Sequence, residues 1–192
     1  MQDTELERRL IGLVRADAAL MAQLAAVRAL ALPDWCIGAG AVRNLVWDAL
    51  AREAAPSQRA DVDVVYFDAA DLSTGRDAAL QRRLAQSHPG VAWEVTNQAG
   101  VHCWYEQHFG QAVAPLTSMA EGVASWPEFA TAVGVSLDAD GTLRVIAPHG
   151  LDDLFAMVVR HNPARVSVNA YRQRLAQKRF AQRWPGVTVI PA

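Results

Sequence analysis

The sequence predicts an α/β (α+β) fold, with a small mixed β-sheet, flanking helices and a small C-terminal lobe made of a hairpin and a helix. Three observations support this prediction. Short apolar segments typical of strands alternate with longer segments whose apolar residues recur every three or four positions, as in helices. A turn of small residues leads from the first predicted strand into a helix. An Asp-x-Asp pair opens the next strand.

The length and composition suit one globular domain, or one domain with a lobe attached. The chain has 192 residues, 52% of them hydrophobic and 20% charged, which excludes a disordered protein. We expect a core over residues 1–115, including an N-terminal packing helix. We expect the C-terminal lobe over residues 116–192, packed as one unit with the core.

Neither a membrane span nor export is expected. The sequence has no run of eighteen apolar residues, and its N-terminus is acidic (Asp3, Glu5, Glu7), unlike a signal peptide. Cys36 and Cys103 stand in apolar contexts without the spacing of metal ligands, so we expect both to be reduced and buried. These features predict a cytoplasmic protein.

The first predicted element is one long amphipathic helix over residues 4–30, which we interpret as a packing helix. Pro33 ends it, and residues 34–37 form the first strand. The turn that follows is made of small residues, Gly38-Ala39-Gly40-Ala41, so a phosphate can approach the backbone closely. The next helix points its free N–H groups and its positive end toward that phosphate.

A polar loop over residues 53–60 precedes a buried strand over residues 61–67, which opens with two acids. Because side chains alternate along a strand, Asp61 and Asp63 lie on the same face. Adjacent carboxylates repel each other unless a cation neutralises them, and their hard oxygens suit Mg²⁺. The alternative is that Asp61 caps the strand and Asp63 is an exposed edge residue.

The third predicted strand, over residues 91–96, has an acid in its middle. Glu94 is costly to bury unless it is paired or bound to a metal. Its alternative partner is an arginine such as Arg43. Asn97 and His102 follow the strand, and each could touch a nucleotide base or close a turn.

The remaining elements are read from periodicity and turn residues. A helix start is expected at Ser125, with Pro127 in its first turn and Glu128 three residues after the cap. The other predicted elements are a helix over 77–87, a hairpin of strands over 133–137 and 143–146, helices over 152–160 and 168–183, and an edge strand over 187–190.

Charge is distributed unevenly along the chain. The net charge is −2, yet no acid follows Asp153, while seven basic residues do: Arg160, Arg165, Arg172, Arg174, Lys178, Arg179 and Arg183. Lys178, the only lysine, shares a predicted helix face with Tyr171 and Arg174. We expect Lys178 to contact phosphate groups of a bound ligand. The alternative is that these charges only neutralise the acidic strand.

These motifs, in this order, resemble the nucleotidyltransferase superfamily of DNA polymerase beta and the tRNA CCA-adding enzymes. The Gly-Gly-x-Val-Arg-Asp turn of that superfamily is matched by Ala39-Gly40-Ala41-Val42-Arg43-Asn44. Over roughly residues 30–185 the chain resembles a small bacterial nucleotidyltransferase-like family, through blocks 35–44, 61–68, 93–98 and 150–155. Three features depart from the superfamily: Ala39 replaces Gly, Asn44 replaces Asp, and the gap to Asp61 is long.

The resemblance implies transfer of a nucleoside monophosphate from a nucleoside triphosphate to an unknown acceptor hydroxyl. Asp61, Asp63 and Glu94 would be the catalytic carboxylates and would bind Mg²⁺ or Mn²⁺. The nucleotide would contact Gly38, Gly40, Ala41, Arg43, Asn44 and Lys178.

Two other functions remain open. One is a nucleotide-binding regulatory module with little catalysis, which would result if no third carboxylate is in reach. The other is an RNA-associated protein that uses the basic C-terminal segment. Nucleic-acid binding is not favoured, because the sequence has no extended basic arm.

Overall fold

The structure is a computed structural model that describes residues 2–51, 61–73 and 75–192. The polar loop predicted over residues 53–60 lies outside the described residues.

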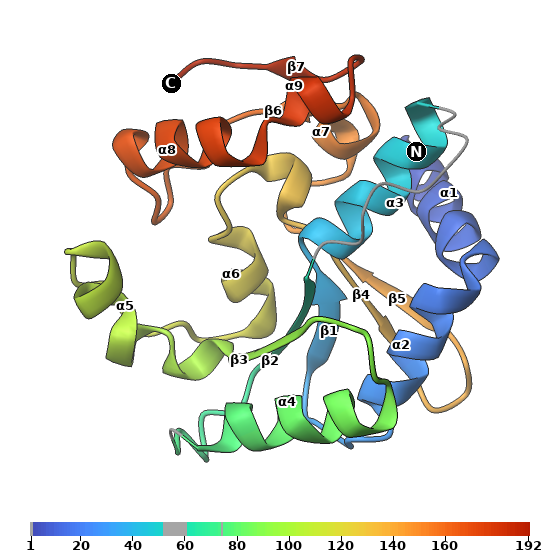
Figure 1. Ribbon diagram of the computed structural model, residues 1–192, viewed down its shortest axis with the longest axis vertical. Helices are drawn as coiled ribbons and strands as arrows, with labels where there is room; N and C mark the ends of the chain where they lie inside the picture. Colours follow the sequence, from blue (N-terminus) through green and yellow to red (C-terminus); the bar gives the residue numbers. More distant parts are fainter. Residues whose placement is uncertain (1, 52–60, 74) are drawn as a thin grey trace.

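Five strands form one mixed sheet in the order β3-β2-β1-β4-β5 (Figure 1). β2 and β3 are parallel, whereas β1 runs antiparallel to both β2 and β4, and β4 runs antiparallel to β5. This confirms the predicted mixed sheet with flanking helices. The strands are β1 (Trp35–Gly38), β2 (Val62–Tyr66), β3 (Trp93–Asn97), β4 (Gly134–Leu137) and β5 (Leu143–Ile146).

The predicted hairpin of β4 and β5 is present, and it belongs to the central sheet. β4 pairs with β1 through Ile37 and Gly38. The strands assigned from the sequence to the C-terminal lobe are therefore continuous with the core. The division of the chain near residue 115 stays a prediction.

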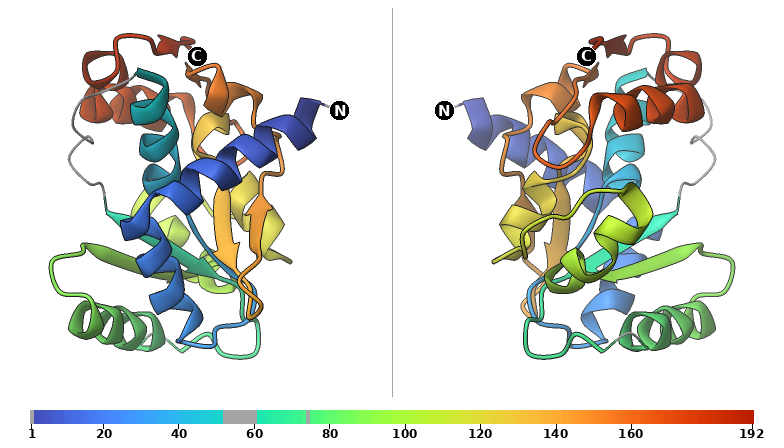
Figure 2. Two further views of the ribbon diagram at one scale, coloured as in Figure 1. Left: turned by 90° about the vertical axis from the view of Figure 1, so that its right-hand side faces the viewer. Right: turned by 90° about the vertical axis from the view of Figure 1, so that its left-hand side faces the viewer.

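The single helix predicted over residues 4–30 is wrong. The segment forms α1 (Gln2–Ala16) and α2 (Ala18–Arg28), bent by 92° at the break between them. Asp17 causes the break, because its side chain accepts a hydrogen bond from the Leu20 N–H at 2.8 Å and caps α2. Both helices lie against one side of the sheet in Figure 2.

Within the described ranges, no single helix has the length and apolar composition needed to cross a membrane. Only α1 and α2 taken together, as a bent pair, pass that test.

The helices that flank the sheet's first strands match the predictions closely. α3 (Gly40–Ala51) follows the small-residue turn, and α4 (Arg76–Ser87) packs on β3. Cys36 on β1 is buried, as expected, but the expectation for Cys103 is wrong, because this cysteine is exposed on α5 (His102–Phe109).

The helix start expected at Ser125 is wrong. Ser118 caps α6 (Met119–Ala124) by accepting the Glu121 N–H, and Ser125 lies at the C-terminal end of that helix. Both serines have a Glu three residues later, so the capping pattern alone does not choose between them. Glu128 instead precedes a short 3₁₀ turn, η2 (Phe129–Thr131).

The C-terminal elements are shorter than predicted. The helix expected over 152–160 is only α7 (Asp152–Phe155), because the chain turns into β6 (Val158–Val159). The helix expected over 168–183 is divided into α8 (Val168–Lys178) and α9 (Phe180–Arg183) by Arg179, whose φ is +49°. The predicted last strand is β7 (Thr188–Val189), which pairs in parallel with β6.

Gly38 has a packing reason for lacking a side chain. A Cβ built there would lie 2.5 Å from the Trp126 ring and 2.9 Å from the Val133 carbonyl oxygen. The sequence suggested that this space admits a phosphate, but Trp126 fills it. Neighbouring Ala39 has a φ of +51° and donates its N–H to the Val133 oxygen at 3.2 Å.

We therefore expect Gly38→Ala to lower the free energy of unfolding by about 1–3 kcal/mol, because the new methyl group overlaps packed atoms. Urea unfolding followed by circular dichroism measures this. Gly12→Ala is the matched control, since no atom lies within 4 Å of its Cβ. In the middle of α1 that change should stabilise by about 0.5–1 kcal/mol. Equal effects of the two changes would contradict the packing role of Gly38.

Candidate active site

Two acids from neighbouring strands lie side by side at one end of the sheet. Asp63 of β2 and Glu94 of β3 are register partners in the parallel pair. Neighbouring strands are about 4.8 Å apart, and partners in register point to the same face. Glu94 is exposed, as is Asp61 just before β2, whereas Asp63 is partly buried. The exposure of Glu94 removes the burial cost that its apolar strand suggested.

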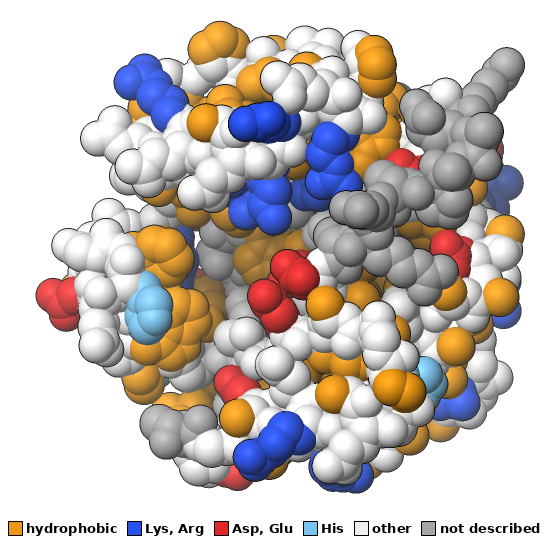
Figure 3. Space-filling view, in the orientation of Figure 1, with side chains coloured by type: hydrophobic (Ala, Val, Ile, Leu, Met, Phe, Trp, Pro, Cys, Tyr) orange, Lys and Arg blue, Asp and Glu red, His pale blue; other side chains and the backbone are white. Residues whose placement is uncertain are grey.

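The pKa of Asp63 responds to charged groups from three segments of the chain. Burial, and then the negative charges of Glu94 and Asp61, raise the pKa of Asp63 to about 6. Lys178 and Arg174 act in the opposite direction. The acids of β2 and β3 and the cations of α8 are therefore close enough to interact. Figure 3 shows acidic and basic side chains gathered at the border of one hollow. We call this hollow the cleft.

The acids suit a cation that arrives with a nucleotide. Among the residues that the structure describes, no three His, Cys, Asp or Glu side chains are arranged to hold a metal ion by themselves. The three acids predicted as ligands therefore do not form a complete metal cage. Mg²⁺ is often held by one or two carboxylates, with substrate phosphates and water completing its shell. The Asp63–Glu94 pair fits that arrangement, and a cation there would offset the repulsion that raises the pKa of Asp63.

Helix α8 brings two basic side chains to the cleft. Arg174 and Lys178 are four residues apart and so lie on one helix face. Burial lowers the pKa of Lys178, as do the charges of Arg174 and Arg43, while Asp63 and Asp61 oppose this shift. Tyr171 is buried instead, and its hydroxyl donates to the backbone oxygens of Val159 and Ile190.

The start of α3 keeps the predicted relation to the turn. α3 begins at Gly40, so the first N–H groups of this helix, including those of Gly40 and Ala41, have no partner within it. These donors remain candidates for binding phosphate.

Arg43 lies in surroundings that the sequence did not predict. Its side chain is 2% exposed and packs over the rings of Phe180, Trp47 and Trp184, at 4.9, 5.4 and 5.9 Å from the ring centroids. Its Nη2 donates to the Asn44 Oδ1 at 2.8 Å, whereas Nε and Nη1 have no hydrogen-bond partner among the residues that the structure describes. Burial lowers the pKa of Arg43 to about 10. In this structure the guanidinium is enclosed by aromatic rings, and its contact with phosphate stays a prediction.

Asn97 has a structural role. Its side-chain oxygen accepts the N–H groups of Asp68 and Ala99, and its amide nitrogen donates to the Asp68 and Asp71 carbonyl oxygens. These four hydrogen bonds hold the turn after β2 against the end of β3, so both polar atoms of the Asn97 side chain are used within the protein.

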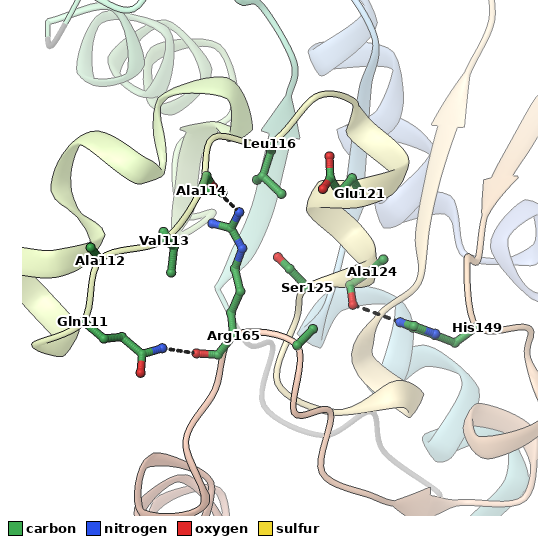
Figure 4. Close-up of a pocket in the computed structure, with 11 residues that line it drawn as sticks. Gln111, Ala112, Val113, Ala114, Leu116, Glu121, Ala124, Ser125, His149 and Arg165 are labelled. Carbon is green, nitrogen blue, oxygen red and sulfur yellow. Dashed lines mark hydrogen bonds between the residues drawn. The ribbon is translucent and has the colours of Figure 1, made fainter.

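A separate hollow of about 590 Å³ lies between the segment after α5, helix α6 and the loop before α8 (Figure 4). Arg165 bridges its walls by donating Nη2 to the Ala114 oxygen and accepting a bond from Gln111 at its own backbone oxygen. None of the predicted site residues lines this hollow.

Glu128 was expected only in the first turn of a helix, and its pairing with Arg174 was not predicted. This acid is 0% exposed, and it accepts bonds from Arg174 Nε at 2.5 Å and Thr131 Oγ1 at 2.6 Å. The signal was present, because Glu128 stands among apolar residues, as Glu94 does.

Comparison with known proteins identifies the family. A family model described as a nucleotidyltransferase matches residues 25–189. The chain belongs to this nucleotidyltransferase family. No curated protein matches it closely enough to count as a relative.

A solved structure shares the fold of this chain. The chain is 28% identical to a protein whose NMR structure is described as revealing a CCA-adding enzyme head domain, with a TM-score of 0.81 and 96% of each chain covered. Similarity extends to a tRNA-processing enzyme in its apo form, at 20% identity and a TM-score of 0.47, with 88% of this chain and 44% of that chain covered.

The CCA-adding enzyme of Bacillus stearothermophilus in complex with CTP is also similar, at 16% identity and a TM-score of 0.45, with 100% of this chain and 42% of that chain covered. The chain thus spans less than half the length of these two larger enzymes.

The raised pKa of Asp63 predicts how stability depends on pH in the absence of metal. The folded protein holds this proton up to about pH 6, whereas the unfolded chain loses it near pH 4. The contribution of Asp63 to the free energy of unfolding is therefore greatest below pH 4, falls between pH 4 and 6, and stays low above pH 6. Asp63→Asn should raise the melting temperature at pH 8 and not at pH 4, measured by thermal unfolding with EDTA.

Asp140→Asn is the control for this experiment. Hydrogen bonds with Thr142 lower the pKa of Asp140, so neutralising that carboxyl should give no gain at pH 8. A higher melting temperature for the wild type than for Asp63→Asn at pH 8 would contradict an unfavourable charge at Asp63.

Proposed function

We propose that the protein transfers a nucleoside monophosphate from a nucleoside triphosphate to an acceptor hydroxyl, with a divalent cation. The observation that supports this most directly is the pairing of Asp63 with Glu94 on adjacent strands, facing Arg174 and Lys178. Membership of a nucleotidyltransferase family and the likeness to a CCA-adding enzyme head domain support the same chemistry.

Asp63 and Glu94 would hold Mg²⁺ or Mn²⁺, with Asp61 at the entrance to the pair. The cation supplies neutralisation of phosphate charge. Lys178 and Arg174 of α8 bind the phosphate tail from the other side of the cleft. The free N–H groups at the start of α3 add donors for phosphate oxygens.

These groups account for each step of the proposed transfer. The acceptor oxygen attacks the α-phosphorus, and the bond from that phosphorus to the oxygen bridging to the β-phosphate breaks. Pyrophosphate leaves, and its negative charge is met by Lys178 and Arg174. The exposed carboxylate of Glu94 accepts the proton of the hydroxyl, as a general base.

The test is a screen of the four ribonucleoside triphosphates against hydroxyl acceptors with Mg²⁺ or Mn²⁺, scored by pyrophosphate release. Asp63→Asn should lower the rate by about 10²–10³-fold, because it removes a charge that acts on the transferring phosphate. The same variant should no longer bind triphosphate in a metal-dependent way in calorimetry. Unchanged triphosphate affinity and unchanged turnover would exclude this function.

Lys178 provides a second test. Lys178→Ala should weaken triphosphate binding about tenfold and leave monophosphate binding unchanged, because the ammonium group meets only the phosphate tail. Arg183→Ala is the comparison, since Arg183 stacks on Trp184 with its charge 4.4 Å from the ring centroid. Small, equal effects of both changes would make the basic helix a scaffold.

A further inference from the structure

Glu128 is a buried acid that pairs with Arg174, one of the two cations of α8 near the acids of the sheet. It lies just before η2, and its backbone forms a β-bridge with His161. Both carboxylate oxygens are used: Oε1 accepts from Arg174 Nε at 2.5 Å and Oε2 from Thr131 Oγ1 at 2.6 Å. Its position is therefore fixed from two sides.

The partner of Glu128 extends from the interior toward the cleft. The Glu128 side chain is 1% exposed, whereas that of Arg174 is 27% exposed. Only the Nε atom of Arg174 is committed to Glu128, and a guanidinium has further N–H donors. The charge of Arg174 acts on Asp63 and on Lys178, so the guanidinium that pairs with Glu128 is also near the acids of the sheet.

Glu128 also compensates a second buried cation. Burial lowers the pKa of Arg43, and the charge of Glu128 is the strongest influence in the opposite direction. The guanidinium groups of Arg43 and Arg174 repel each other, and the carboxylate of Glu128 offsets that repulsion. One buried negative charge thus allows two positive charges to stay close together beside the phosphate-binding elements.

Stability alone does not explain this arrangement. Taking an ion pair out of water costs several kcal/mol, and well-packed apolar residues often stabilise a protein as well or better. A buried acid that holds the Nε atom of a partly exposed arginine has a different use, because it limits where the other guanidinium nitrogens can point.

We propose that Glu128 is a positioning residue that holds Arg174 at the roof of the cleft, so that Arg174 and Lys178 together bind the β- and γ-phosphates of a nucleoside triphosphate. This inference rests on the proposed function, because it names the part of the substrate that α8 recognises. Glu128 itself does not touch the nucleotide.

The test uses Glu128→Gln, which keeps the shape of the side chain and one acceptor oxygen, but removes the charge and replaces the second oxygen with an amide donor. Calorimetry with Mg²⁺ is done with whichever of ATP, CTP, GTP and UTP binds the wild type most tightly, and with the corresponding monophosphate. We expect triphosphate binding to weaken about tenfold, because Arg174 loses the charge-assisted hydrogen bond to Glu128 that holds it in place. Monophosphate binding should be unchanged.

Arg174→Lys is the second variant, and it serves if Glu128→Gln does not fold. Lysine keeps a positive partner for Glu128, but its single ammonium cannot pair with the acid and reach the phosphates as a guanidinium can. It should show the same selective loss. The double variant should lose no more than the larger single loss, because both changes break one pair.

Asp153→Asn is the matched control, since it breaks the Asp153–Arg160 ion pair, which lies in the same part of the chain and is formed by none of the proposed site residues. It should leave both affinities unchanged. Wild-type triphosphate affinity in Glu128→Gln and Arg174→Lys, or equal losses for triphosphate and monophosphate, would overturn the inference. If Asp63→Asn still loses triphosphate binding in that case, the proposed function stands without it. If Asp63→Asn also binds normally, the proposed function fails.

Discussion

The parallel pairing of β2 with β3 is the constraint on which the rest of the site depends. Its register sets Asp63 beside Glu94 on the same face of the sheet. A slip of one residue would send one of the two acids to the opposite face. The register is supported by apolar neighbours on the other face, since Val62, Val64, Trp93 and Val95 are all buried. The apolar core therefore determines where the two charges meet.

Acidic and basic side chains come together at the cleft because α8, near the C-terminus, lies close to the acids of β2 and β3. Arg174 and Lys178 lie on α8, which the Tyr171 hydroxyl ties to the β6–β7 region. Trp184 of the next segment donates its indole N–H to Asp48 of α3 at 2.7 Å. These contacts attach the basic helix to the same helix that begins at the small-residue turn. The elements that we propose for phosphate binding, the start of α3 and the face of α8, therefore come from the two halves of the chain.

Much of this site could be predicted from local sequence. The alternation of side chains in β2 and β3 placed Asp63 and Glu94, and the small-residue turn placed the start of α3. The bends at Asp17 and Arg179 could not be predicted, because helical periodicity continues through both positions. The pairing of Glu128 was not predicted, because its partner Arg174 is 46 residues away in the sequence. The aromatic rings around Arg43 could not be predicted either, because Trp47 and Phe180 are far apart in the sequence and come together only in the folded protein.

Because Lys178 is the only lysine in the sequence, the chain has a single side-chain amine, and the fold directs it to the cleft. Its lowered pKa leaves a larger share of that amine unprotonated than in an ordinary surface lysine. Reagents that acylate or reductively alkylate amines will therefore distinguish Lys178 from every other side chain. A fluorophore or cross-linker attached in this way reports directly on whatever occupies the space beside Asp63. Acetylation of Lys178 alone would remove all the positive charge that lysine side chains give this protein.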